Sequence, residues 1–124
     1  MAEPIILLID IDGTICPQCD GDYEKLLPYS EAITTINRLF DDGYKIIFFT
    51  SRFMGRTKGN VEKARDVGYV FTLQQLKTWG VKFHELYMGK PRSDFIIDDR
   101  ALFFKNDWTE IYKAIQARRV ALKK

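Results

Sequence analysis

The chain has 124 residues, of which 46% are hydrophobic and 29% charged, and its formal net charge is +2. This composition is typical of a globular protein and excludes an intrinsically disordered chain. The length suits one domain with a buried core and leaves no room for a substantial second domain, so we expect residues 1–124 to form a single domain.

Residues 5–9 form an apolar run that is far shorter than a membrane span, and residues 1–4 lack the features of a signal peptide. We therefore expect a cytoplasmic protein with no membrane partner, in which Cys16 and Cys19 are reduced thiols. The basic residues near the C-terminus suit the end of a solvated helix. No wider basic stripe accompanies them, so no nucleic-acid partner is expected.

Short apolar runs at residues 5–9, 45–49 and 95–97 have the composition of buried parallel strands, and residues 85–88 form a weaker fourth candidate. Helical patterns lie between and after these runs. Alternating strands and helices predict an α/β fold, a single Rossmann-like domain with a central parallel sheet flanked by helices. A ligand site is expected outside the carboxyl ends of the strands.

Three helices are expected, each with its own start signal. Ser30 is a good cap for residues 31–40, which residues 41–43 end. Thr72 can cap a short helix before Gly80, and Asp107 can cap a last helix. In the last helix, four side chains are expected to face the core: Ile111, Ala114, Ile115 and Val120. Core positions are also expected for Phe48, Phe49, Phe71, Trp79, Phe83, Phe103, Phe104 and Trp108.

Polar residues follow each predicted strand directly. Asp10 and Asp12 are two apart on an extended segment, so both can face one site, while Gly13 lets the backbone turn away. Thr50 and Ser51 end the second strand and offer hydroxyl and backbone N–H donors for an oxyanion. The strand ends therefore combine carboxylates with groups that bind phosphate.

Further polar residues complete this pattern. Lys90 follows the weaker strand, and Asp98 and Asp99 follow residues 95–97. Arg52, and less clearly Arg56, could reach an anionic substrate through the guanidinium group. Mg²⁺ takes oxygen ligands, and a carboxylate that attacks a phosphate needs nearby cations to offset the repulsion.

In this order the residues resemble motifs one to four of the haloacid dehalogenase superfamily. The resemblance covers residues 5–103 and rests on residues 10–14, the strand ending in Thr50, Lys90, and the strand ending in Asp98 and Asp99. It implies a magnesium-dependent phosphatase that acts on a small phosphorylated substrate.

Each site residue has an implied role. Asp10 would be the nucleophile, forming an aspartyl-phosphate and ligating Mg²⁺. Asp12 would act as general acid and base and ligate the metal through its backbone carbonyl; dehalogenases lack an acid there. Asp98 would be the second carboxylate ligand, with Asp99 binding through water or supporting the site. Thr50 and Lys90 would bind phosphoryl oxygens, as would Ser51, with Arg52 as a further candidate.

The gaps between the motifs, residues 15–44 and 53–89, each hold a helix and leave no room for a full cap domain. The chain thus resembles the capless members, which often close their sites by oligomerisation, and a homo-oligomer is expected. Residues 75–81, 84–86, 89–94 and 97–101 also resemble small phosphatases of capsule and surface-polysaccharide biosynthesis. This narrower resemblance implies a sugar phosphate substrate.

Other interpretations stay open. A signalling receiver domain also uses a phosphorylatable aspartate, but places its acidic pair after the first strand and leaves Asp12 unexplained. A domain that binds a phosphorylated ligand without turnover would carry the same motifs. Residues 16–19 have the CxxC spacing of a redox motif or half a zinc site, although the lack of further cysteines favours a plain loop.

Overall fold

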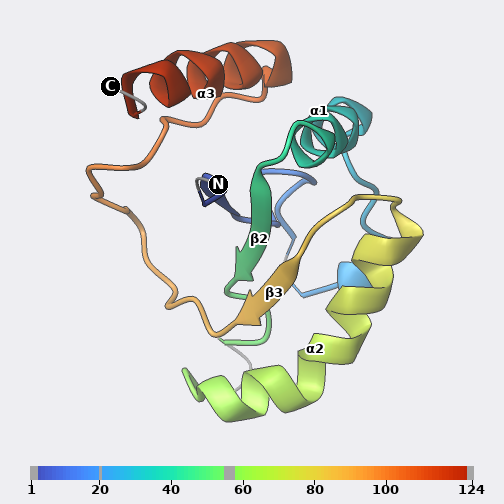
Figure 1. The fold of residues 1–124 in the computed structure, drawn as a ribbon. Coiled ribbons are helices and arrows are strands. Elements are labelled where there is room, and N and C mark those ends of the chain that lie inside the picture. Colours follow the sequence, from blue (N-terminus) through green and yellow to red (C-terminus); the bar gives the residue numbers. More distant parts are fainter. Residues whose placement is uncertain (1–2, 20, 55–57, 123–124) are drawn as a thin grey trace.

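A computed structural model describes residues 3–19, 21–54 and 58–122. Its elements run in the order β1 (Ile6–Ile9), η1 (Tyr23–Lys25), α1 (Ser30–Asp41), β2 (Lys45–Thr50), α2 (Val61–Thr78), β3 (Glu85–Met88) and α3 (Trp108–Leu122). Within these residues the strands form a parallel three-stranded sheet, ordered β1-β2-β3, which helices flank (Figure 1). The predicted α/β, Rossmann-like class is confirmed.

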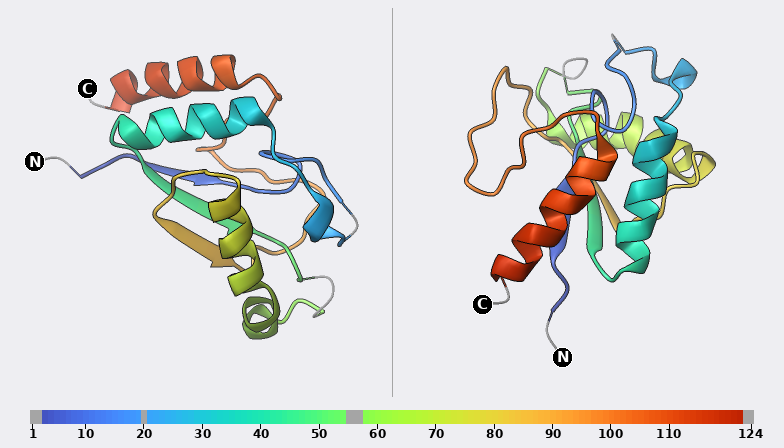
Figure 2. Two further views of the ribbon diagram at one scale, coloured as in Figure 1. Left: turned by 90° about the vertical axis from the view of Figure 1, so that its right-hand side faces the viewer. Right: turned by 90° about the horizontal axis from the view of Figure 1, so that it is seen from above.

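The two faces of the sheet differ in burial. Ile46, Phe48 and Leu86 point to one face and are at most 5% exposed. Ile6 and Leu8 point to the other face and are 57% and 60% exposed. Both α1 and α2 lie on the buried side (Figures 1 and 2). The core therefore forms between these helices and the inner face of the sheet.

The amphipathic pattern of α1 buries Ala32, Ile36 and Leu39 against the core. Its first helical residue is Ser30, and the extended residue before it is Tyr29, so the prediction that Ser30 caps the helix was wrong. The predicted stop at residues 41–43 is confirmed: Gly43 takes a φ of +100°, which a residue without a side chain adopts readily.

Helix α2 begins well before the predicted start. Asn60 caps it, because its side chain accepts a hydrogen bond from the backbone N–H of Lys63 at 3.0 Å. Thr72, predicted as the cap, lies buried in the helix interior. The apolar pattern was weak because Gly68 faces the core, where its missing side chain admits the ring of Phe53.

The last helix starts as predicted, since Asp107 accepts a hydrogen bond from the N–H of Glu110 at 3.2 Å. It packs on α1: the Tyr112 hydroxyl donates to Asp42 at 2.6 Å, and the Arg38 guanidinium lies 4.1 Å from the Tyr112 ring centre. Because α3 contacts α1 along one stripe only, fewer of its apolar side chains are buried than predicted. Ile111 and Ile115 are partly buried, whereas Ala114 and Val120 are exposed.

The predicted strand at residues 95–97 does not form, because no strand of the described chain lies beside it. All of residues 91–107, which we call the arm, are exposed, and the arm arcs away from the sheet (Figures 1 and 2). Arg118 on α3 donates to the backbone oxygens of Asp99 and Arg100 at 2.9 and 3.4 Å. The prediction of core positions also fails for Phe103 and Phe104, which are 89% and 36% exposed.

Among the described helices, none has both the length and the apolar character needed to cross a membrane.

The contact between Gly68 and Phe53 predicts the effect of adding one methyl group. An added Cβ at Gly68 would lie 2.1 Å from the Phe53 ring. We expect Gly68→Ala to lower the free energy of unfolding by about 1–3 kcal/mol, as overpacking does elsewhere, despite the higher helix propensity of alanine. Urea denaturation measures this, with the exposed Val67→Ala on the same helix as control. A Gly68→Ala variant more stable than wild type would contradict the packing described.

Candidate functional site

A polar pocket of about 650 Å³ opens at the carboxyl ends of β1 and β2. Parallel sheets commonly place their ligand sites at this edge. Its lining includes most of the predicted site residues together with several that were not predicted. The polar side chains in its wall include Asp10, Asp12, Gln18, Tyr23, Thr50, Ser51, Arg52, Lys90, Arg92 and Asp94.

Asp10 directly follows β1 and is held from two sides. The Thr14 hydroxyl donates to Asp10 Oδ2 at 3.2 Å, and Lys90 Nζ lies 3.4 Å from Oδ1. Burial raises the pKa of Asp10 above its ordinary value, and the positive charge of Lys90 offsets part of that rise. The carboxylate is therefore partly desolvated, beside one cation, and open to the pocket.

The turn after Asp10 brings Asp12 back towards the same pocket. The N–H of Ile15 donates to the Ile11 carbonyl at 2.9 Å, and the N–H of Gly13 donates to the Cys16 carbonyl at 2.8 Å. Gly13 has a φ of +83°, a left-handed conformation that favours glycine. This tight turn places two carboxylates at the end of one strand.

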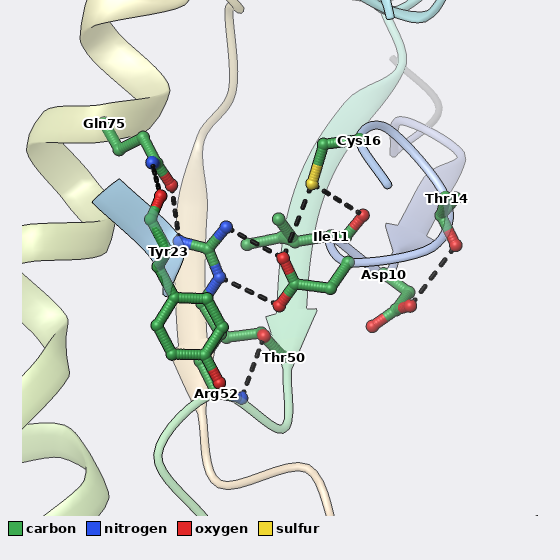
Figure 3. A network of polar contacts seen from close by, with 9 residues as sticks. Asp10, Ile11, Thr14, Cys16, Tyr23, Thr50, Arg52 and Gln75 are labelled. Carbon is green, nitrogen blue, oxygen red and sulfur yellow. Dashed lines mark hydrogen bonds and ion pairs between the residues drawn. The ribbon is translucent and has the colours of Figure 1, made fainter. Parts of the chain in front are cut away.

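Arg52 is the most heavily bonded side chain of the site (Figure 3). Its Nε and Nη2 donate to the two carboxylate oxygens of Asp12, each at 2.9 Å, and Nη1 donates to the side chain of Gln75. The guanidinium carbon lies 4.6 Å from the centre of the Tyr23 ring. The Arg52 side chain is 0% exposed. The guanidinium of Arg52 is thus bonded to Asp12 and Gln75, and the predicted role of Arg52 in binding substrate stays a prediction.

The end of β2 joins both sides of the pocket. Thr50 is 1% exposed, and its hydroxyl oxygen accepts a hydrogen bond from the N–H of Arg52 at 3.1 Å. The Thr50 carbonyl accepts from the N–H of Lys90 at 3.0 Å, which brings Lys90 from beyond β3 to the pocket. Ser51 also lines the pocket. The predicted residues Asp10, Asp12, Thr50, Ser51 and Lys90 thus converge.

Asp98 and Asp99 do not join them in this conformation. Both are exposed on the arm and absent from the pocket wall, and Asp98 Oδ1 accepts from the N–H of Arg100 at 2.8 Å. In the described part of the chain, no cluster of three or more acidic, histidine or cysteine residues could hold a metal ion. Arg56 lies outside the described residues. A metal role for Asp98 and Asp99 stays a prediction that requires a different course of the arm.

Three contacts of the site were not predicted from the sequence. Tyr23 and Gln75 enclose Arg52, and the side-chain amide of Gln75 also donates to the Tyr23 carbonyl at 2.6 Å. Asp94 adds a carboxylate to the pocket wall. Gln75 and Asp94 lie within the segments 75–81 and 89–94 of the narrower resemblance, which gave them no individual role, and no sequence signal pointed to Tyr23.

The CxxC segment forms a loop, as favoured from the sequence, and both of its cysteines are free. The thiol of Cys16 lies 3.4 Å from Asp12 Oδ1 and donates to it. Burial, and next the negative charge of Asp12, raise the pKa of Cys16 to about 12. Cys16 is therefore a protonated neighbour of the site rather than a reactive thiolate.

No protein-family model matches the sequence, and no curated protein matches it. Among solved structures, the fold is similar to that of a crystallographic target protein from Vibrio cholerae, with a TM-score of 0.74 and 26% identity over 90% of this chain and 98% of the other. A D,D-heptose 1,7-bisphosphate phosphatase from B. bronchiseptica, solved with magnesium and phosphate, gives a TM-score of 0.49 and 14% identity over 93% of this chain and 63% of the other. The first likeness supports the α/β fold, and the second is too weak to carry an inference about activity.

The pair between Arg52 and Asp12 predicts a large cost for removing the arginine alone. Arg52→Met leaves a mostly buried carboxylate without its partner, which should cost about 3–5 kcal/mol of unfolding free energy. Adding Asp12→Asn removes the unpaired charge, so the double variant should be more stable than the sum of the two single effects. A double-mutant cycle by denaturant unfolding measures this coupling. Strictly additive effects would show that the pair does not organise the site.

The raised pKa of Asp10 predicts a pH-dependent gain in stability. Because ionised Asp10 is disfavoured in the folded state, Asp10→Asn should raise the free energy of unfolding at neutral pH. The gain should shrink as the pH falls through the folded-state pKa and vanish below the ordinary value of 3.8, where both states hold the proton. Urea titrations of metal-free protein at several pH values, with Glu3→Gln as control, measure the effect. A gain independent of pH would contradict it.

Proposed function

We propose that this protein is a magnesium-dependent phosphatase of the haloacid dehalogenase type. It would hydrolyse a small phosphorylated metabolite through an aspartyl-phosphate on Asp10. The observation that carries the proposal is the convergence of Asp10, Asp12, Thr50 and Lys90 on one pocket at the carboxyl ends of parallel strands. These residues come in the order of the motifs they resemble.

In the first step, a carboxylate oxygen of Asp10 attacks the phosphorus, and the bond to the leaving oxygen breaks. Lys90 and Thr14 hold the two oxygens of Asp10, which limits the rotation of the carboxylate before attack. The raised pKa of Asp10 indicates a carboxylate that is poorly solvated, and such a carboxylate loses less hydration when the substrate binds.

Asp12 would transfer the protons. It gives one to the leaving oxygen in the first step and takes one from the water that then attacks the phosphorus, releasing phosphate and free Asp10. Both oxygens of Asp12 accept hydrogen bonds from Arg52. One of these bonds must therefore be exchanged before Asp12 donates a proton, and Arg52 controls where that carboxylate points.

Thr50, Ser51 and Lys90 would bind the phosphoryl oxygens. The hydroxyl oxygen of Thr50 already accepts from the N–H of Arg52, which leaves its hydrogen to donate to a phosphoryl oxygen. Lys90 supplies a positive charge that offsets the growing charge of the transition state. The pocket volume of about 650 Å³ suits a small metabolite.

The candidate metal ligands around Asp10 are oxygen donors, as Mg²⁺ requires, but the described pocket offers fewer carboxylate ligands than the predicted site. Asp10 and the backbone carbonyl of Asp12 would hold it, with Asp98 as second carboxylate and Asp99 acting through water. All are hard oxygen donors, as Mg²⁺ requires. The bound cation would reduce the repulsion between Asp10 and the phosphate dianion. Asp98 and Asp99 lie outside the pocket wall while the arm keeps its present course.

Within this proposal the substrate is a sugar phosphate, acted on in the cytoplasm during surface-polysaccharide biosynthesis. The polar wall of the pocket supports a hydroxylated substrate, since it offers Gln18, Ser93 and Asp94 as hydrogen-bonding groups beyond the phosphate-binding end. No cap domain covers the pocket in the described chain.

The proposal predicts hydrolysis of an aryl phosphate that requires Mg²⁺ and stops on chelation. Asp10→Asn should lower kcat by at least about 10³-fold, because it removes the nucleophile. Asp12→Asn should lower kcat by about 10²–10⁴-fold but still allow beryllium fluoride to bind at Asp10. Phosphate release assays and fluorine NMR measure the two effects.

A panel of sugar phosphates and nucleotides then identifies the preferred class by kcat/KM. Gln74→Ala, at an exposed position on α2, serves as the control variant and should keep wild-type kcat. Turnover without a divalent cation, or an Asp10→Asn variant with full activity, would overturn the assignment.

A further inference from the structure

The outer face and one edge of the sheet leave apolar surface uncovered by any described element. Ile6, Leu8 and Tyr87 on the outer face are 57%, 60% and 49% exposed. Among the residues that the structure describes, β1 pairs only with β2, so its other edge presents a row of backbone groups to which a strand can add. Purely parallel sheets are normally buried on both faces. This sheet therefore lacks an element.

The arm has the composition of the missing element. It is exposed throughout residues 91–107, and Phe95 and Ile97 are 87% and 100% exposed. Residues 95–97 are β-branched and aromatic, as strands prefer. The exposed apolar side chains of the arm are Phe95, Ile96, Ile97, Leu102, Phe103 and Phe104. One chain thus has an apolar arm that is exposed along its length and an apolar sheet face that no described element covers.

The segment that connects β3 to residues 95–97 is too short to let these residues pair readily with β1 of the same chain. Only residues 89–94 separate Met88, at the end of β3, from residues 95–97, about half of the dozen or more residues that a parallel crossover needs. The free edge also lies beyond both β2 and β1, about 14 Å away. Lys90 is already bound beside β2 through the carbonyl of Thr50.

The far end of the arm is held on its own chain as well. Arg118 donates to the carbonyls of Asp99 and Arg100, and Trp108, which is 3% exposed, anchors the start of α3. Residues 91–94 and Ile96 line the pocket at the ends of β1 and β2, and beyond them the arm projects as an open loop away from its own sheet (Figures 1 and 2). A loop in this position can contact the sheet of a second copy.

We propose that two copies of this chain form a symmetric dimer by exchanging arms, so that residues 95–97 of each copy add to the free edge of β1 of the other. Reciprocal exchange uses the same surface on both copies, and the assembly therefore closes at two. The exchange pairs the free edge of β1 and buries apolar side chains of both arms against the sheet of the other copy, which provides the driving force.

The exchange also completes the catalytic site, and this part rests on the proposed function. A strand that runs parallel to β1, with residue 97 beside Ile9, ends at the same edge of the sheet as β1. Asp98 of the partner subunit then lies directly after the added strand, at the same edge of the sheet at which Asp10 follows β1. The partner's Asp98 thereby becomes the second carboxylate for Mg²⁺ that the described pocket lacks.

Disulfide cross-linking tests the exchange without any assay of activity. Two variants are prepared, Leu8→Cys and Ile96→Cys, each also carrying Cys19→Ser. The two chains are made with different lengths so that they can be told apart, and they are mixed, refolded together and oxidised. Neighbouring strands bring these positions within disulfide range, so a covalent pair with one chain of each kind should form. Both sites are exposed, so folding should be unaffected. Val120→Cys, 58% exposed on α3, is the control and should not link to Leu8→Cys.

Mixing inactive variants tests the trans contribution of Asp98. Asp10→Asn and Asp98→Asn should each be inactive in turnover. When equal amounts are refolded together, half of the dimers are mixed and each mixed dimer has one intact site, so about a quarter of the wild-type rate should return.

The outcomes separate the exchange from the proposed function. A monomer by light scattering, with no link between chains, overturns the exchange whatever the activity. If the mixture of Asp10→Asn and Asp98→Asn shows no turnover while the wild-type protein is active, Asp98 does not act in the site of the partner subunit. The phosphatase proposal stays intact in that case. A cross-linked dimer without phosphatase activity supports the exchange and overturns the proposed function.

Discussion

The buried ion pair between Arg52 and Asp12 is the interaction on which the site depends. A guanidinium with no exposure needs all its polar neighbours, because an unpaired buried charge is far costlier than the pair is stabilising. Here the neighbours come from the turn after β1, from Gln75 on α2 and from the ring of Tyr23. One side chain thereby fixes three segments around the pocket. The orientation of the Asp12 carboxylate follows from that packing.

The sheet illustrates which parts of the fold were predictable from sequence. Ile46, Ile47 and Phe48 are apolar and buried, and composition alone predicted the strand at residues 45–49. Residues 95–97 are equally apolar yet have no strand beside them, because pairing depends on chain length and neighbours that a local pattern does not contain. Helix α2 was shortened in the prediction since Gly68 breaks its apolar stripe, although that glycine admits Phe53 to the core.

The site was predicted in part for the same reason. Asp10, Thr50 and Lys90 follow strands that do form, and the rule that ligand sites lie at carboxyl ends therefore predicted that they share one pocket. Asp98 follows a strand that does not form, and it therefore lies elsewhere. Arg52 lies in the pocket wall, but its contacts were not predicted, because no sequence pattern reveals that a loop arginine is enclosed by α2 and η1. The resemblance to known motifs identified residue types, while packing determined their partners.

The central claim is that Asp10 carries the phosphoryl group during turnover. Acid quenching within the first turnover, followed by borohydride reduction, converts an aspartyl-phosphate to homoserine, which peptide mass spectrometry locates. The account predicts homoserine at position 10 in the wild-type protein incubated with Mg²⁺ and substrate, and none when substrate is omitted. Rapid phosphate release with an unmodified Asp10, or modification at another carboxylate, would contradict it.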